Sequence, residues 1–118
     1  MKNTRVHGSY RSWFDNGQSK MEFFSINNVM SGEYKEWTVE GNLLWEIVEM
    51  TTESKITVKN FWDNGQVKME GKADMPPSLS IHQWSQTRDG YWTYYYKDGT
   101  VLKSEKYTGG QLINVQMP

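Results

Sequence analysis

The sequence predicts an all-β fold: an antiparallel meander of four consecutive β-hairpin repeats, about eight strands, in a single twisted sheet. Two observations lead to this prediction. Four segments of the 118-residue chain align with one another without gaps, and each carries an Asn-Gly, Asp-Gly or Glu-Gly pair near its centre. The length suits one domain, so we treat residues 1–118 as a single repeat domain.

The repeat units lie at residues 8–22, 32–46, 56–70 and 90–104. Self-similarity at a fixed period indicates an array in which each unit is one supersecondary element. The central glycines are spaced by 24 residues, except that the last interval is 34 residues because an insertion falls within residues 72–88. These glycines are Gly17, Gly41, Gly65 and Gly99.

The centre of each unit predicts a tight turn. Asn16-Gly17, Asn64-Gly65 and Asp98-Gly99 fit a two-residue type I′ turn, which requires positive φ at both central residues. Glu40-Gly41 fits this turn less well, because glutamate disfavours positive φ. Each unit is therefore expected to be a β-hairpin that reverses at its glycine.

A two-residue turn also predicts which side chains face each other. In the first unit Trp13 would pair with Lys20, and Ser12 with Met21. The same register places a basic residue opposite a glutamate in three units, and such cross-strand pairs contribute roughly 0.2–1 kcal/mol each. The expected pairs are Arg11–Glu22, Lys35–Glu46 and Lys59–Glu70.

Side chains alternate between the two faces of a strand, so this register gathers a nearly continuous apolar face. A single-layer sheet must cover such a face, by curling strongly, by folding the insertion over it, or by forming a face-to-face homodimer. The expected members are Tyr10, Phe14, Met21, Phe23, Tyr34, Leu43, Trp45, Ile47, Val58, Trp62, Val67, Met69, Trp92, Tyr94, Tyr96 and Val101.

The opposite, polar face has one aromatic residue at the centre of each unit. In consecutive hairpins these residues would form a row across a charged surface. Trp and Tyr dominate the energetics of protein interfaces, so the row is a candidate partner-binding site. The alternative is that each ring only packs over neighbouring Lys and Arg stems and stabilises the sheet. The row consists of Trp13, Trp37, Phe61 and Tyr95.

The insertion is the second candidate for partner binding. Met75-Pro76-Pro77 ends any strand, because proline cannot donate to a ladder. Long insertions in regular arrays often carry function, and His82 and Trp84 are the residues to follow. The alternative is that Trp84 and its neighbour Ile81 fold back as a lid on the apolar face. Residues 1–6 and 111–118 are expected to cap the array, with a last strand near 112–115 as an option.

Composition argues against several functional classes. The formal charge is −1, with basic and acidic residues interspersed, which disfavours nucleic-acid binding. The chain lacks cysteine, and its histidines, His7 and His82, have no metal-ligand spacing. We find no nucleophile motif and no phosphate-binding glycine loop, so we predict no catalytic residue, metal or cofactor. No signal peptide or membrane span is predicted, and cysteine-free composition suits the cytoplasm.

The pattern in residues 8–22, G-S-Y-R-S-W-F-D-N-G-Q-S-K-M-E, resembles the bacterial variant of the MORN repeat, found in YwqK-type proteins described as antitoxin components. Residues 32–46 and 56–70 carry the pattern too, and 90–110 carries it through Asp98-Gly99 and the trailing Tyr107-Thr108-Gly109-Gly110. The resemblance covers about two thirds of the chain and departs from the pattern at Ile56 and Thr38. It implies an elongated sheet of successive hairpins that binds another protein.

We therefore expect a non-enzymatic protein-binding module, either an antitoxin-like protein whose partner is a toxin, or an inhibitor encoded by a phage or mobile element against a host factor. The alternative is small-ligand or single-stranded nucleic-acid binding through the aromatic row, since aromatic side chains stack on bases. The charges beside the row weigh against this alternative, because acidic residues offset the basic ones. Contact with anionic lipid is a weaker idea that the net charge also disfavours.

Overall fold

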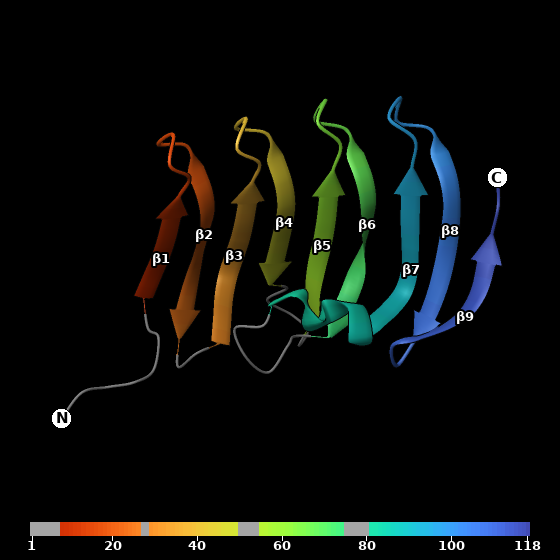
Figure 1. Cartoon of the computed structure of the whole chain (residues 1–118). Coiled ribbons are helices and arrows are strands. Elements are labelled where there is room, and N and C mark those ends of the chain that lie inside the picture. The colour runs from red at the N-terminus through yellow and green to blue at the C-terminus, as the bar shows by residue number, and fades with distance from the viewer. Residues whose placement is uncertain (1–7, 27–28, 50–54, 75–80) are drawn as a thin grey trace.

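The structure is a computed structural model that describes residues 8–26, 29–49, 55–74 and 81–118. Its nine strands form one antiparallel sheet in which every strand pairs with its neighbour in sequence (Figure 1). The predicted meander of hairpins is confirmed. The elements are β1 (Gly8–Trp13), β2 (Ser19–Ile26), β3 (Val29–Trp37), β4 (Leu43–Glu49), β5 (Lys55–Phe61), β6 (Val67–Asp74), the 3-10 helix η1 (Ile81–Gln86), β7 (Arg88–Tyr95), β8 (Val101–Thr108) and β9 (Gln111–Gln116).

The four repeats are the hairpins β1–β2, β3–β4, β5–β6 and β7–β8. Their turns all lie at the same end of the strands (Figure 1). The C-terminal residues add a ninth strand, β9, which pairs with β8 after the turn at Gly109-Gly110. The cap expected at residues 1–6 lies outside the described residues.

The turns have three residues rather than the predicted two. In the first hairpin Phe14 N donates to Gln18 O at 2.8 Å, and Gly17 N donates to Phe14 O at 3.0 Å. Gly17 has a φ of 88°, so the loop is a type I turn that ends in a left-handed glycine. Such a loop needs positive φ only at the glycine, which explains why Glu40 is acceptable beside Gly41. The same pair of hydrogen bonds recurs around Gly41, Gly65 and Gly99.

A bulge beneath each turn compensates for the extra loop residue. Trp13 pairs with Ser19 instead of Lys20, and the register then shifts so that Ser12 still faces Met21. The predicted pairing is therefore right in the part of the hairpin away from the turn, and it is wrong in the part next to the turn. Equivalent shifts fall between Glu36 and Trp37, Asn60 and Phe61, and Tyr94 and Tyr95.

The core lies on the face that carries the predicted apolar residues. Ile47, Val58 and Trp92 are fully buried there. The next row towards the turns is mixed, because polar Glu36 and Asn60 face Trp45 across the strands. One line of facing residues crosses the whole sheet: Tyr10, Phe23, Tyr34, Ile47, Val58, Gly71, Trp92, Glu105 and Val115.

The bulges move three predicted core residues to the other face. Leu43, Val67 and Val101 each lie directly opposite a member of the aromatic row, so they share its face. A one-residue register change transfers a side chain from one face of a sheet to the other. The polar face thus carries more apolar surface next to the turns than the sequence predicted.

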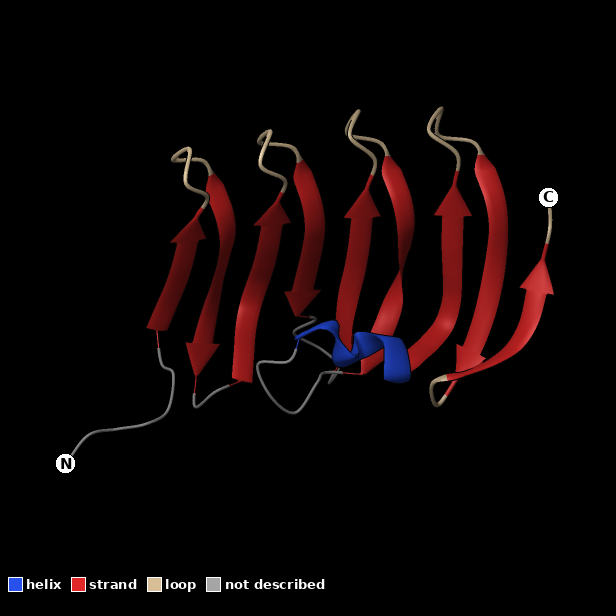
Figure 2. Ribbon diagram, viewed as in Figure 1, coloured by secondary structure: helices blue, strands red, loops and turns tan. Residues whose placement is uncertain are grey.

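The insertion forms a cover for the core. Helix η1 lies at the end of the sheet opposite the hairpin turns (Figure 2). Its Trp84 is 7% exposed and stacks on Trp92, with ring centroids 5.1 Å apart and planes 11° apart. The rings of Trp45 and Trp84 also pack together, with centroids 5.6 Å apart and planes tilted by 52°. The lid alternative therefore describes Trp84; the side chain of Ile81 lies outside the described residues.

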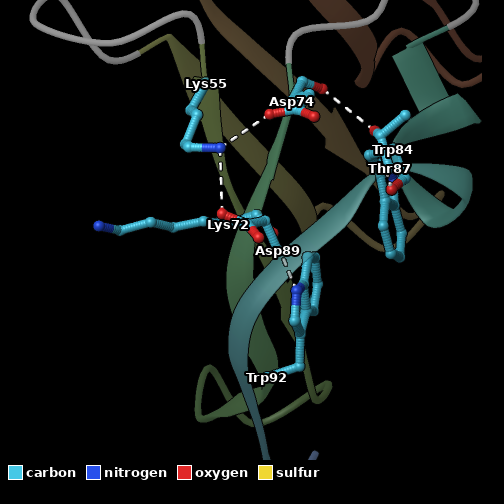
Figure 3. Close-up of polar contacts among 7 residues, drawn as sticks. All are labelled: Lys55, Lys72, Asp74, Trp84, Thr87, Asp89 and Trp92. Atoms are coloured by element: carbon cyan, nitrogen blue, oxygen red, sulfur yellow. Dashed lines mark hydrogen bonds and ion pairs between the residues drawn. The ribbon is translucent and has the colours of Figure 1, made fainter. Parts of the chain in front are cut away.

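Polar contacts hold the two ends of the insertion together (Figure 3). Lys55 Nζ contacts Asp74 Oδ1 at 2.8 Å and Asp89 Oδ2 at 3.1 Å, so one ammonium group joins β5, β6 and β7. The hydroxyl of Thr87 donates to Asp74 O at 3.2 Å. These contacts fix the position at which β7 enters the sheet after η1.

Candidate protein-binding surface

The aromatic row occupies one strand position in four alternate strands. Trp13 ends β1, Trp37 ends β3, Phe61 ends β5 and Tyr95 ends β7. All four lie on the face opposite the core, because each follows a core-facing residue in its strand. The structure therefore places these four predicted site residues on one face beside the turns.

The members of the row differ in exposure. Trp13 is 57% exposed, whereas the other three rings are half-buried. The strand after each ring contributes a smaller side chain to the same strip: Ser19, Leu43, Val67 and Val101. We call these eight residues the turn-side strip. The turn-side strip combines four aromatic rings with three aliphatic side chains and one serine. It lies on the face of the sheet that the sequence predicted to be polar.

A line of charges runs beside the turn-side strip. Arg11 faces Glu22, Glu22 faces Lys35, and the alternation continues through Glu46 and Lys59 to Glu70. The predicted register of these charges is correct. Only Arg11 and Glu22 come into contact within the described part of this line, at 3.1 Å between Nη2 and Oε2. The sequence therefore predicted the alignment of all three pairs correctly, but among the described residues only Arg11 and Glu22 form an ion pair.

Glu70 has a different partner from the predicted one. The Tyr95 hydroxyl donates to Glu70 Oε2 at 2.5 Å, across the β6–β7 boundary. This hydrogen bond, together with burial, raises the pKa of Tyr95 to about 12. Lys59 has no ion pair within the described residues, and neither has Lys35.

Two shallow hollows open on the same face. One of about 340 Å³ lies over β1–β3 and is lined by Arg11, Glu22 and Lys35 among others. The other, of about 450 Å³, lies over β5–β7 beside Lys59, Lys72 and Tyr91. Members of the line of charges form part of the walls of both hollows. A partner on this face would therefore meet concave surface as well as apolar side chains.

The turns themselves are linked in pairs. Asn16 Nδ2 donates to Val39 O at 3.1 Å, which joins the first turn to the second. Asn64 Nδ2 donates to Lys97 O at 2.9 Å, which joins the third turn to the fourth. These bonds hold neighbouring members of the turn-side strip at a fixed separation along the edge.

The two predicted residues from the insertion are not part of this surface. Trp84 is buried against the core, so it is not available to a partner in this conformation. His82 belongs to η1 on the far side of the sheet, and its side chain lies outside the described residues.

The sequence analysis missed Leu43, Val67 and Val101 as members of the surface. The signal was present in the tripeptide Asp-Asn-Gly, which occurs at residues 15–17 and 63–65. Three-residue hairpin loops commonly end in a left-handed glycine. Counting the loop from Asp15 rather than Asn16 moves only the residue next to each turn to the correct face, because the bulge restores the predicted register in the rest of the strand.

No family model, no curated protein and no solved structure matches this chain. Its function must therefore be argued from the surface itself. Within the described residues, no three His, Cys, Asp or Glu side chains are grouped so that they could hold a metal ion. The described helix is neither long nor apolar enough to cross a membrane.

Proposed function

We propose that the chain is a non-enzymatic protein-binding module and that its partner docks on the turn-side strip. The observation that carries this proposal is the exposure of Trp13 in line with Trp37, Phe61 and Tyr95 on a face that has no role in the core. A large exposed indole costs a folded protein solubility, whereas buried aromatic anchors supply most of the energy in protein interfaces.

The surroundings of the strip suit a protein partner better than a nucleic acid. Single-strand binding proteins combine stacked aromatics with a positively charged groove that follows the backbone. Here every basic residue in the adjacent line has a glutamate directly opposite, as Lys35 has Glu22 and Glu46 on its two sides. Such alternation favours a partner that carries both signs of charge.

The resemblance to MORN-variant repeats supports the same class of function. We infer that the partner is a toxin or a host factor and that the chain acts as an antitoxin-like protein or as an inhibitor from a phage or mobile element. A small single-layer sheet of this kind suits inhibition by occlusion of a partner's surface.

The test compares matched variants in partner capture from a bacterial lysate. We expect Trp37→Ala and Trp13→Ala to fold but to lose a stoichiometric partner that the unmodified chain retains. Tyr10→Ala is the control, because Tyr10 is 44% exposed on the opposite face. A partner lost equally from the control and the row variants would contradict the proposal. Quenching of Trp fluorescence by a single-stranded oligonucleotide at low salt would favour the alternative ligand class.

The homodimer expected from the apolar face is a competing use of the molecule. Helix η1 covers the part of that face around Trp45 and Trp92, while Tyr10 lies at its N-terminal end with 44% of its surface exposed. Light scattering separates the two cases: a dimer that Tyr10→Ala dissociates places a second copy on this face. A monomer leaves the turn-side strip as the binding surface.

A further inference from the structure

The strand β9 forms one edge of the sheet. It pairs with β8 on one side, and no described strand pairs with its other side (Figure 1). All six of its residues are exposed. The backbone N–H and C=O groups of such an edge are a template for another strand, and natural proteins usually guard them with charged side chains, proline or a covering segment. The composition of β9 therefore decides how well this edge is guarded.

The edge strand β9 contains no Asp, Glu, Lys or Arg. Each of the other eight described strands has at least one of these residues, including β1 at the opposite edge, which carries Arg11. Uncharged segments of about six residues that favour the extended conformation and lack proline and glycine pair readily with one another. The strand β9 has this composition, so it lacks the charges that would keep another strand away.

The core side of β9 is apolar and uncovered. Leu112 lies opposite Tyr107 and Val115 lies opposite Glu105, so both aliphatic side chains continue the core face. Tyr107 is 7% exposed, whereas Leu112 is 50% and Val115 is 46% exposed. A further strand beside β9 would cover these two side chains from the open side, and burial of their apolar surface would favour its binding.

A bulge in β9 brings these two side chains to the same face. The pairing with β8 passes from Leu112 directly to Asn114, so Ile113 is an extra residue. In a regular strand Leu112 and Val115, three residues apart, would lie on opposite faces. A bulge is one device that protects an edge, but this one also changes the order of faces along the strand.

The residues at the two ends of β9 share the other face. Gln111 lies opposite Thr108, and Gln116 lies opposite Ser104, on the face away from the core. The order of faces is therefore the same in both directions along the strand. From either end, a glutamine on the outer face is followed by an aliphatic side chain on the core face.

An antiparallel pair of two β9 strands matches this symmetry. A two-fold axis perpendicular to the sheet places Gln111 opposite the second copy's Gln116, and Leu112 opposite the second copy's Val115. Facing residues then lie on the same face, amide beside amide and aliphatic beside aliphatic, and no like charges meet. Continuation of the array in its own direction would instead place β1 of the next copy parallel to β9, whereas every pair in this sheet is antiparallel.

We propose that β9 is a docking edge for a second copy of this chain, in which the two β9 strands pair antiparallel about a two-fold axis. The juxtaposition that carries it is an uncharged, exposed edge strand whose side chains have a symmetrical order of faces. The dimer is one continuous sheet, with the turn-side strips of both copies on the same face. One short strand per copy buries less area than the about 1,600 Å² of a standard interface, so dimerisation depends on concentration.

The test measures the mass of the chain by light scattering over a series of concentrations, in which the unmodified chain should pass from monomer to dimer. Gln111→Lys combined with Gln116→Lys places lysines opposite each other at both ends of the pair and should weaken the dimer roughly tenfold. Gln111→Glu combined with Gln116→Lys places opposite charges at the same positions and should keep or tighten the dimer. The two variants differ at one residue, so they are matched controls for each other.

Mixing of two variants gives a second measurement of the same pairing. A chain with Gln111→Glu and Gln116→Glu should be mostly monomeric alone, because its introduced carboxylates repel one another. It should form a dimer with the double-lysine chain, because each carboxylate then faces an ammonium group. Near-UV circular dichroism of the stacked Trp84 and Trp92 verifies in each variant that the core is retained.

Several results overturn the inference. They are a chain that stays monomeric at every concentration, a dimer that the two lysines leave unchanged, and equal weakening by the two matched variants. The last result would mean that the strands pair in parallel or that another surface is responsible. Growth beyond the dimer would also contradict a closed two-fold pair.

The inference and the proposed function fail separately. Trp13→Ala and Tyr10→Ala should leave this dimer intact, because both residues lie on β1 at the opposite edge of the sheet. A dimer that depends on Tyr10 but not on β9 would instead place the second copy on the apolar face. Partner capture that depends on Trp13 supports the turn-side strip whether or not the chain dimerises through β9.

Discussion

The indole of Trp92 lies directly over the backbone of Gly71 in the neighbouring strand. A Cβ atom at Gly71 would overlap the ring atoms of Trp92, which are the heavy atoms nearest to that position. The indole nitrogen donates to Lys72 O at 2.9 Å, which fixes the ring in its plane (Figure 3). Gly71 has no positive φ, so glycine is needed here for space rather than for backbone conformation.

We therefore expect Gly71→Ala to destabilise the fold by about 1–3 kcal/mol, the usual cost of overpacking. The added methyl group pushes Trp92 away from Trp84, so the near-UV circular dichroism of the stacked indoles should weaken. Urea unfolding followed by far-UV circular dichroism measures the free energy. Thr93→Ala is the control, because Thr93 follows Trp92 but faces the opposite side of the sheet. Equal stability of the two variants would show that the ring moves aside without cost.

Truncation of a buried and of an exposed tryptophan should change the stability of the fold by different amounts. Trp84 is 7% exposed between Trp45 and Trp92, so Trp84→Ala should lower the free energy of unfolding by about 3–5 kcal/mol. Trp13 is 57% exposed, and Trp13→Ala should change it by no more than about 0.5 kcal/mol. Urea midpoints of the two variants test both values. Similar midpoints would mean that Trp13 also belongs to the core.

Sequence reasoning predicted the hairpin order and most of the core, because turn glycines and alternation are local signals. Ile47, Val58 and Trp92 are buried on the predicted face, and Arg11 faces Glu22 as expected. The three-residue loop was misjudged because Asn-Gly alone fits a two-residue turn equally well. That single choice moved Val67 to the wrong face.

The position of Trp84 and the partner of Glu70 could not be derived from sequence. Each depends on residues far away in the chain, as Trp84 depends on Trp45 and Glu70 on Tyr95. The alternation rule gives the face of a side chain but not which of two neighbouring strands supplies its partner. The candidate surface was therefore predicted as a row, while its apolar interleaving was not.

The hydrogen bond between Tyr95 and Glu70 predicts a pH dependence at high pH. Its folded-state pKa of about 12 lies above the ordinary value of 10.0, so the contribution of Tyr95 to stability is complete below pH 10. It is lost as the pH rises from about 10 to about 12. We expect Tyr95→Phe to cost about 1 kcal/mol at neutral pH and to differ less from the unmodified chain at pH 12. Urea unfolding across this range measures the difference.

A spectroscopic control accompanies that experiment. Absorbance at the tyrosinate band should show one fewer group titrating near pH 12 in Tyr95→Phe. Burial, followed by hydrogen bonding to Glu105, also raises the pKa of Tyr94 to about 12, so Tyr94 titrates in the same range in both proteins. A loss of amplitude near pH 10 instead would contradict the assigned hydrogen bond.

Removal of the hydrogen bond between the first two turns should lower the stability slightly and affect only the neighbouring turn. Asn16→Asp keeps the side-chain oxygen that accepts from Gln18 N at 3.0 Å but removes the Nδ2 donor to Val39 O. Asp98 fills the equivalent position in the fourth turn, so the loop tolerates aspartate. We expect a loss of about 0.5–1.5 kcal/mol and faster amide exchange in the turn around Glu40. Asn64→Asp should affect the fourth turn in the same way and leave the second unchanged.

Glu105 is a buried carboxylate in the line of facing core residues, and its contacts predict an acid-sensitive contribution to stability. The Tyr107 hydroxyl donates to its Oε1 at 2.9 Å, and Lys103 Nζ contacts its Oε2 at 3.2 Å. Burial alone would raise the pKa of Glu105, but hydrogen bonds from Tyr107, Tyr94 and Lys103 outweigh it and hold the pKa below its ordinary value of 4.5.

A lowered folded-state pKa means that Glu105 stabilises the fold above pH 4.5 and that this contribution is lost as the pH falls through the folded-state value. We expect Glu105→Gln to cost about 1–3 kcal/mol at pH 7, since it replaces hydrogen bonds to a charged group. The difference in the free energy of unfolding between Glu105→Gln and the unmodified chain should become smaller below pH 4.5. Glu33→Gln, at an exposed position on the other face, is the control. A gap that stays constant from pH 7 to pH 3 would show that the buried side chain acts through packing rather than through its charge.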